Sequence, residues 1–458
     1  MNAEGGLPVP QRHWAALALL LGLVLAVLDS AIANVALPTI SRALGVSAAD
    51  SILIVNAYLL VITVSMLPLA ALGERIGFHR VYLSGLALFT VASIGCAMAD
   101  SLLSLTLARV IQGFGAAAII SMNSALMRTI YPTGKLGQGI SLNTAVMAIA
   151  SVTGPSVASA VLSFAQWPWL FLINLPVGAL ALAVGLKALP RMAGHGRPYD
   201  LTSALMCAVT LGLAIAGVDA IGRDTQLLWV ALTLAVALVC GWFFVKRQLT
   251  QATPLLPLDL LKIPVFSLSI GTSFSTCVAQ GLTFVSLPFL MHSAWGMSAL
   301  QIGPLMMPWP LAIVFTAPLA GYLSDRYSAM LMCSIGLLLL TSGLLLMATV
   351  GAHPAAADIA WRMAICGAGI GFFQAPNARQ VLTSVPRQRS AGASAMQSIA
   401  RFSGQSFGAA LVGLLFGLSS ETSTTPVLLA AGFAAVSAVL SLSRGLGLKA
   451  GMPEVKVD

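Results

Sequence analysis

The chain has 458 residues, of which 58% are hydrophobic and only 8% are charged. A soluble globular protein carries roughly 25% charged residues, so this composition excludes a chain folded in water and indicates a membrane protein. The net charge of +9 would suggest nucleic-acid binding in a soluble chain, but in a membrane protein the positions of the basic residues decide their meaning. The six cysteines show no CxxC spacing, so we expect neither a disulfide framework nor a metal site.

Apolar runs recur along the whole chain, and a run of about 20 such residues is enough to cross a bilayer as a helix. We therefore expect an all-α integral membrane protein with fourteen transmembrane helices. The expected spans are 14–37, 51–72, 80–99, 102–124, 138–163, 168–189, 201–220, 227–246, 265–290, 301–323, 329–350, 358–382, 391–417 and 426–444. The spans at 201–220 and 227–246 are nearly featureless and separate two groups of six.

The basic residues orient these spans. With the N-terminus inside, 18 of the 23 Lys and Arg residues fall on cytoplasmic segments, and only Arg42 and Arg223 fall outside. This bias is the positive-inside rule. We therefore expect both termini in the cytoplasm and interpret the net charge as topology, without nucleic-acid binding. The remaining three, Arg109, Arg362 and Arg401, lie within spans.

The two groups of six spans repeat each other. The matched segments are Pro68–Arg75 with Pro318–Arg326, Gly113–Asn123 with Gly367–Asn377, and Ile149–Ser156 with Ile399–Ser406. Three matches in one order indicate two pseudo-symmetric six-helix bundles with two extra helices inserted between them. We expect an N-terminal bundle at 1–195, the inserted helices at 196–250 and a C-terminal bundle at 251–458. Such halves rock about a site near the membrane midplane in many secondary transporters.

Asp29 is the one carboxylate that we place deep inside a span. If the helix enters the hydrocarbon near Ala15, Asp29 lies ~9 Å from the outer face of a ~30 Å core, and Arg109 lies ~10 Å below the outer end of its own span. Burial favours the neutral acid, whereas a nearby guanidinium favours the carboxylate, so Asp29 can load and release a proton. The alternative is a static ion pair that holds helices together.

A short charged loop follows the second span, from Gly73 to Arg80. We predict that Glu74, Arg75 and Arg80, with Asp325 and Arg326 at the matching place in the second half, form a cytoplasmic gate that clamps the bundles together. The alternative is a positively charged cytoplasmic loop without this function.

Gly154 and Pro155 lie inside the fifth span. Proline removes a backbone hydrogen bond and kinks a helix, and glycine allows a neighbouring helix to approach closely. The pair is predicted to act as a hinge or seal, with an ordinary helix kink as the alternative.

Polar and aromatic residues at membrane depth are candidates for the wall of a substrate cavity. Arg401 takes the place of Ser151 in the repeat and lies near the midplane, while Trp309 lies within the segment Met306–Pro310 that breaks the tenth span. Core packing or hydrogen bonding between helices is the alternative for each. The full set of cavity candidates is Asn34, Gln112, Asn123, Trp309, Gln374, Asn377 and Arg401.

These motifs resemble the major facilitator superfamily, and in particular its fourteen-spanner drug–proton antiporter branch. The resemblance is carried by Leu28–Pro38, Arg109–Gly115 and Trp167–Gly178, and it covers nearly the whole chain. It implies that Asp29 and Arg109 couple transport to protons, that Glu74, Arg75 and Arg80 form the clamp, and that Gly154-Pro155 belongs to an antiporter motif. The chain departs from the family pattern at the first glycine of that motif, where it has Ala150.

We therefore predict a proton-coupled exporter of small amphipathic compounds in a bacterial inner membrane, acting as a monomer. Its partners would be the substrate, protons and the lipid bilayer, and its energy source the proton gradient, without a cofactor. A narrow-specificity metabolite or organic-ion carrier of the same fold is the alternative. A membrane-embedded enzyme would need clustered catalytic side chains, and a sensor would need a soluble output domain, and the sequence offers neither.

Overall fold

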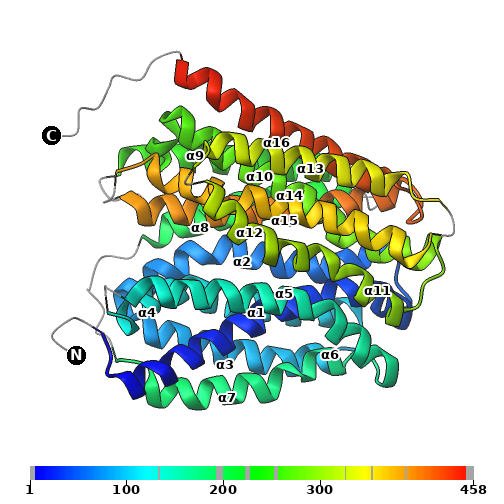
Figure 1. The fold of residues 1–458 in the computed structure, drawn as a ribbon. Helices are drawn as coiled ribbons and strands as arrows, with labels where there is room; N and C mark the ends of the chain where they lie inside the picture. The colour runs from blue at the N-terminus through cyan, green and yellow to red at the C-terminus, as the bar shows by residue number, and fades with distance from the viewer. Residues whose placement is uncertain are drawn as a thin grey trace. The chain divides into compact units, whose positions relative to one another are not determined.

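A computed structural model of the chain describes residues 6–132, 135–191, 200–221, 227–251, 256–324, 326–351, 354–386 and 389–449. The structure in these ranges is helical, as the composition predicts (Figure 1). The α-helices are α1 (Val9–Leu44), α2 (Ala48–Ile76), α3 (Phe78–Ala97), α4 (Leu102–Ile130), α5 (Leu136–Phe164), α6 (Trp169–Leu172), α7 (Asn174–Ala188), α8 (Leu201–Ile221), α9 (Leu227–Thr250), α10 (Pro264–Phe289), α11 (Ala299–Met306), α12 (Pro308–Leu323), α13 (Ala329–Ala348), α14 (Ala356–Thr383), α15 (Ser390–Leu418) and α16 (Thr425–Lys449).

The expected spans coincide with these helices. Thirteen helices in the described ranges are long and apolar enough to cross a membrane. The remaining expected span is α8, in which the described apolar segment Thr202–Val218 is shorter. The all-α multi-pass fold is thereby confirmed.

Two spans are interrupted. The sixth consists of α6 and α7, which meet at Ile173, and the tenth consists of α11 and α12, which meet at Met307. Pro308 begins α12 and has no backbone N–H to continue the helix before it. The predicted break in the tenth span is therefore confirmed.

The chain divides into two compact units. Unit 1 comprises Met1–Arg247, Phe284–Met307 and Ala409–Ser423, and unit 2 comprises Gln248–Thr283, Pro308–Gly408 and Thr424–Asp458. The expected boundaries after residues 195 and 250 follow the sequence repeat and stay a prediction.

Within unit 1, α1 packs against α5 and α7 and also contacts α2 and α4, while α4 lies against α2 and α3. Helices α3 and α7 run beside each other (Figure 1). The outer faces of several helices carry exposed large apolar side chains, among them Leu103 and Leu107 on α4. In a spanning helix such a face suits contact with lipid.

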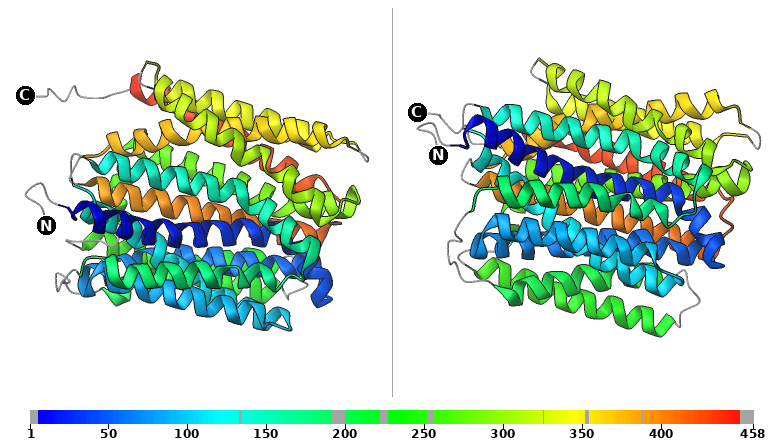
Figure 2. Two further views of the ribbon diagram at one scale, coloured as in Figure 1. Left: turned by 60° about the horizontal axis from the view of Figure 1, so that its bottom comes forward. Right: turned by 90° about the horizontal axis from the view of Figure 1, so that it is seen from below.

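Within unit 2, α14 packs against both α12 and α13, and α16 covers α13. Helices α13 and α14 lie side by side in both views of Figure 2. The large buried side chains of this unit include Trp309 and Phe266, each 0% exposed.

The repeat seen in the sequence reappears in the packing inside each unit. In α4, a Cβ on Gly113 would meet the Tyr58 carbonyl of α2, and one on Gly115 would lie 2.7 Å from the Gly85 carbonyl of α3. In α14, the matching Gly367 faces α12 at Trp309, and the matching Gly369 faces α13, where a Cβ would lie 2.6 Å from the Gly336 carbonyl. The same two glycines thus let corresponding helices approach closely in each unit.

We expect Gly115→Ala and Gly369→Ala to lower the free energy of unfolding by roughly 1–3 kcal/mol each, because the added methyl group meets backbone atoms that cannot move aside easily. Gly212→Ala is the matched control, since a Cβ there would have nothing within 4 Å. SDS titration of the purified protein, followed by circular dichroism, measures the change. If both variants unfold like Gly212→Ala, close packing at these glycines is contradicted.

Candidate functional site

Asp29 lies in the interior of unit 1, in the middle of α1. The residue is 2% exposed, and its neighbours along the helix, Ala26, Ile32 and Ala33, are buried as well. The surrounding segment of α1 is apolar, so the helix is buried by its overall hydrophobicity and brings the carboxylate with it. The structure therefore buries this acid inside unit 1.

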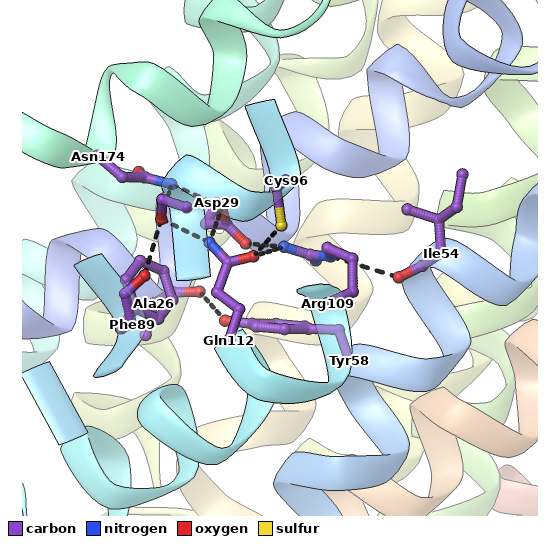
Figure 3. A network of polar contacts seen from close by, with 10 residues as sticks. Ala26, Asp29, Ile54, Tyr58, Phe89, Cys96, Arg109, Gln112 and Asn174 are labelled. Carbon is purple, nitrogen blue, oxygen red and sulfur yellow. Dashed lines mark hydrogen bonds and ion pairs between the residues drawn. The ribbon is translucent and has the colours of Figure 1, made fainter. Parts of the chain in front are cut away.

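The carboxylate accepts hydrogen bonds on both oxygens, as Figure 3 shows. Arg109 of α4 donates from Nη1 to Oδ2 and forms the ion pair with Asp29. Oδ1 accepts from the side-chain amides of Gln112, at 3.0 Å, and of Asn174, at 2.8 Å. The charge of Asp29 is thus matched by one cation and stabilised by two neutral donors.

Arg109 is 0% exposed and is fixed by several helices. Its Nε donates to the Ile54 carbonyl of α2 at 3.3 Å, and its guanidinium lies 4.0 Å from the centre of the Tyr58 ring. A second ring, Phe171 of α6, lies 5.6 Å away. The aromatic faces stabilise the buried cation where water cannot.

Gln112 connects the two charged residues. Its Oε1 accepts from Arg109 Nη1 at 2.6 Å, while its Nε2 donates to Asp29 and to Ser93 Oγ of α3. The Cys96 thiol also donates to Oε1, at 3.4 Å. Among the side-chain atoms of this cluster, Arg109 Nη2 and Asn174 Oδ1 have no hydrogen-bond partner within the described ranges.

This cluster ties α1 to α2, α3, α4 and α7 through one carboxylate and one guanidinium. Protonation of Asp29 would remove the charge that holds Arg109 and would weaken the two amide hydrogen bonds. The arrangement can therefore convert the gain or loss of one proton into a change in how α1 is held by its neighbours. It is equally a set of hydrogen bonds that stabilises the unit while Asp29 stays charged.

Sequence reasoning missed several members of the cluster. Ser93, Cys96 and Asn174 received no role, although each is 0% exposed here. A single asparagine at the start of an apolar helix, as Asn174 is, was the available signal, because a buried amide needs partners at membrane depth.

Gly154 and Pro155 pack next to this cluster. A Cβ on Gly154 would meet the Cβ of Ala31 and lie 3.7 Å from the Leu28 carbonyl, and these two residues flank Asp29 along α1. On the other side of α5, the Pro155 carbonyl lies against Gly303 of α11, and Ser159 Oγ donates to the Ala299 carbonyl at 2.6 Å. The predicted hinge or seal is thus a tightly packed point of unit 1, and its movement stays a prediction.

Four of the seven cavity candidates are buried inside their own unit, and three of them form side-chain hydrogen bonds there. Gln112 is part of the Asp29 cluster, and Asn123 donates to Asn143 Oδ1 at 2.9 Å. Asn377 donates to Ser273 Oγ at 2.7 Å, and Trp309 is packed with its carbonyl against Gly367. Each is at most 3% exposed in this structure. Contact of these four residues with a substrate stays a prediction.

The other three candidates are at least partly exposed as residues, although the Oδ1 atom of Asn34 is buried. Asn34 is partly buried and its Oδ1 has no partner within the described ranges. Gln374 is exposed on α14, and Arg401 is partly exposed on α15. Contact of these three residues with a substrate stays a prediction.

The residues of the predicted cytoplasmic gate lie at helix ends. Glu74, Arg75 and Arg80 are exposed where α2 ends and α3 begins. Arg326 is exposed too, and its guanidinium lies 4.9 Å from the centre of the Tyr322 ring. Asp325 lies outside the described residues. The clamp stays a prediction.

A cavity of about 750 Å³ opens elsewhere in unit 1. It is lined by the last residues of α1, the start of α2 and the ends of α10 and α15, and its charged or titratable residues are Arg42, Asp50, His292 and Glu421. Asp29, Arg109 and the cavity candidates do not line it, so we do not assign it to the same site.

We expect Arg109→Gln to lower the free energy of unfolding by about 3–5 kcal/mol, because it leaves Asp29 buried without its cation. The double variant Asp29→Asn, Arg109→Gln should regain most of this loss, since both charges are then absent. Arg362→Gln is the control: Arg362 pairs with Asp358 at 3.2 Å near a helix end, a partly exposed pair worth at most about 1 kcal/mol. SDS titration measures all three, and an equal loss for the two arginines would contradict the buried pair.

We expect Gly154→Ala to destabilise the protein by roughly 1–3 kcal/mol, because the new methyl group overlaps the Cβ of Ala31. Adding Ala31→Gly should restore stability, since it removes the Cβ that the new methyl group would overlap. Thermal unfolding of the single and double variants checks this. Ala31→Gly should give no such rescue to Gly115→Ala, and a rescue of both would argue against a specific contact between α1 and α5.

Comparisons with known proteins show which family the chain belongs to. The family model described as Major Facilitator Superfamily matches residues 19–409 and 268–446. The "Uncharacterized transporter YebQ" of Escherichia coli is 48% identical over 94% of this chain and 95% of its own length. The "Riboflavin transporter RibZ" of Clostridioides difficile is 28% identical over 83% of each chain, and the "Multidrug resistance protein Stp" of Mycobacterium tuberculosis is 31% identical over 86% of this chain and 74% of its own.

The fold agrees with these relatives. The crystal structure of a POT family transporter in complex with a thioalcohol-conjugated peptide superposes with a TM-score of 0.70 over 95% of this chain and 96% of that one, at 16% identity. The family resemblance seen in the motifs is thereby confirmed. The chain belongs to the Major Facilitator Superfamily and is a multi-pass membrane transporter, not an enzyme.

Proposed function

We propose that this transporter exports small amphipathic compounds in exchange for protons, with Asp29 as the residue that carries the proton. The observation that carries this proposal is the burial of Asp29 in a cluster with a single compensating cation, Arg109. A carboxylate at membrane depth is costly, and such residues usually serve a proton or ion pathway.

The network supports coupling because its bonds depend on the charge of Asp29. While Asp29 is ionised, it holds Arg109 of α4 and Asn174 of α7. When it is protonated, the guanidinium loses its counter-ion and keeps its contacts with the Ile54 carbonyl and the Tyr58 ring of α2, with Gln112 of its own helix and with the Phe171 ring of α6. Two arrangements of α1 are then favoured by two protonation states, which alternating access requires.

Export, as opposed to uptake, is supported by the names of relatives. Stp is named as a multidrug resistance protein, and a Streptomyces glaucescens relative that is 29% identical over 88% of this chain is named as a tetracenomycin C resistance and export protein. Exposed or partly exposed polar residues, Asn34, Gln374 and Arg401, would contact the substrate. The buried candidates would contact the substrate only if the helices rearrange.

The bacterial origin of these relatives and the distribution of Lys and Arg support a place in the cytoplasmic membrane, with both termini in the cytoplasm. The exposed gate residues Glu74, Arg75, Arg80 and Arg326 would then lie on the cytoplasmic side. We propose that the protein acts as a monomer.

A narrow-specificity carrier of the same fold is the second candidate. The name of the relative RibZ, a riboflavin transporter, favours it. Both candidates share the proton step at Asp29, and the range of compounds transported distinguishes them.

We expect Asp29→Asn to abolish proton-coupled transport, because the amide has no titrating proton, while the protein still inserts in the membrane. Proteoliposomes with an imposed pH gradient, a pH-sensitive dye inside and a broad panel of compounds outside measure it. Proton flux coupled to substrate should fall to the level of empty liposomes. Asp358→Asn, which alters a carboxylate at a helix end, is the control and should transport like the original protein. Coupled flux that persists in Asp29→Asn would reject the proton role.

A further inference from the structure

A row of polar side chains follows one face of α15 in unit 2. Gln397, Arg401 and Gln405 recur at every fourth residue, which places them one above the other on the helix surface. All three are partly exposed. No hydrogen bond or ion pair joins these three side chains to the part of the protein that the structure describes. Polar groups at membrane depth that lack protein partners need water or a ligand.

Arg401 has no carboxylate to balance it within the described part of unit 2. Asp259 lies before α10 and accepts from Arg389 at 2.8 Å, a hydrogen bond that holds the pKa of this carboxyl below its ordinary value. Asp358 pairs with Arg362 at 3.2 Å. Both acids are therefore committed to other arginines. A guanidinium in the middle of a spanning helix without a counter-ion is costly, which favours an anion supplied from outside the chain.

The guanidinium is held in place by its neighbours. It lies 4.8 Å from the centre of the Phe402 ring, the next residue along α15. Helix α10 approaches α15 closely, because a Cβ on Gly404 would lie 2.6 Å from the Phe274 carbonyl. A guanidinium fixed against an aromatic ring keeps its N–H edge available for a planar anion, which it can bind with two parallel hydrogen bonds.

The repeat shows that this charge is particular to one half of the chain. Arg401 corresponds to Ser151 of α5, whose hydroxyl donates to the Met147 carbonyl of its own helix. The matching position in unit 1 is thus neutral and satisfied. Asp29 lies in unit 1 and Arg401 in unit 2, so the proton and an anionic group would be bound by different residues.

We propose that Gln397, Arg401 and Gln405 form the subsite for the anionic group of the substrate, and that the transporter therefore takes amphipathic organic acids that carry a carboxylate. This inference rests on the proposed function as an exporter and names its substrate class. Arg401 binds the carboxylate through its N–H edge, and the two amides offer further donors on either side. The apolar part of the substrate is not recognised by this row.

The test measures equilibrium binding without any gradient. The full-length protein in nanodiscs is titrated with two pairs of fluorescent probes, fluorescein and its methyl ester, and 1-pyrenebutyrate and its methyl ester, with empty nanodiscs subtracted. The original protein should bind each acid more tightly than its ester. Arg401→Gln should weaken binding of the acids at least about tenfold and leave the esters nearly unchanged, because one charge-assisted interaction is lost. Arg401→Lys should lose less, and the control Arg362→Gln should bind like the original protein.

Three results would overturn the proposal. The first is that the original protein binds no acid or binds acid and ester equally well. The second is that Arg401→Gln still prefers the acids, and the third is that Arg401→Gln weakens binding of acid and ester by the same factor. If Arg401→Gln does not fold, as judged by thermal unfolding, Gln405→Leu replaces it as the deciding variant and should weaken binding of the acids alone. The proton role of Asp29 is measured separately as coupled flux, so either proposal can fail while the other stands.

Discussion

A carboxylate and a guanidinium that share an interior without water must remain partners, because the loss of either leaves an uncompensated charge. This requirement organises unit 1. Asp29 and Arg109 are 2% and 0% exposed, and the groups that complete their hydrogen bonding come from α2, α3, α4 and α7. At the level of Asp29, helix α1 is therefore held by a polar network, whereas most of its other buried residues are apolar. A change in the charge of Asp29 would be felt by every helix that contributes to the cluster.

Small residues give the charged pair its position. Gly113 allows α4 to approach α2 at Tyr58, the residue whose ring lies against Arg109, and Gly154 allows α5 to approach α1 beside Asp29. Side chains at these places would separate the helices and lengthen the hydrogen bonds of the cluster. The glycine pattern and the buried charges thus depend on each other, although they are far apart in the sequence. In the described part of unit 2 the glycines recur at Gly367 and Gly369 without a fully buried ion pair, and Arg401 is the single charged residue of α15.

The sequence predicts the fold closely, because hydropathy fixes where a helix must lie in a membrane and the internal repeat fixes the order of the halves. It also predicts that Asp29 and Arg109 lie close together, since two opposite charges at the same membrane depth have few other partners. It does not predict that Gln112, Asn123 and Asn377 are used inside their own units, because a polar residue in an apolar run looks the same whether it faces a helix or a cavity. The part played by Asn174 and Ser93 depends on rotamers and helix rotation, which periodicity does not resolve.

One detail of the cluster bears on how a proton could be accommodated. Both oxygens of Asp29 face donors only, from Arg109, Gln112 and Asn174, so a hydroxyl hydrogen on the neutral acid would meet other hydrogens. The unused acceptor nearby is Asn174 Oδ1. Turning that side-chain amide over by half a rotation would present its oxygen to the acid and withdraw its NH₂ group. Protonation of Asp29 would then require the side-chain amide of Asn174 to reorient. The hydrogen bonding of α7, a helix with no charged residue in its interior, would therefore change with the protonation state of Asp29 on α1.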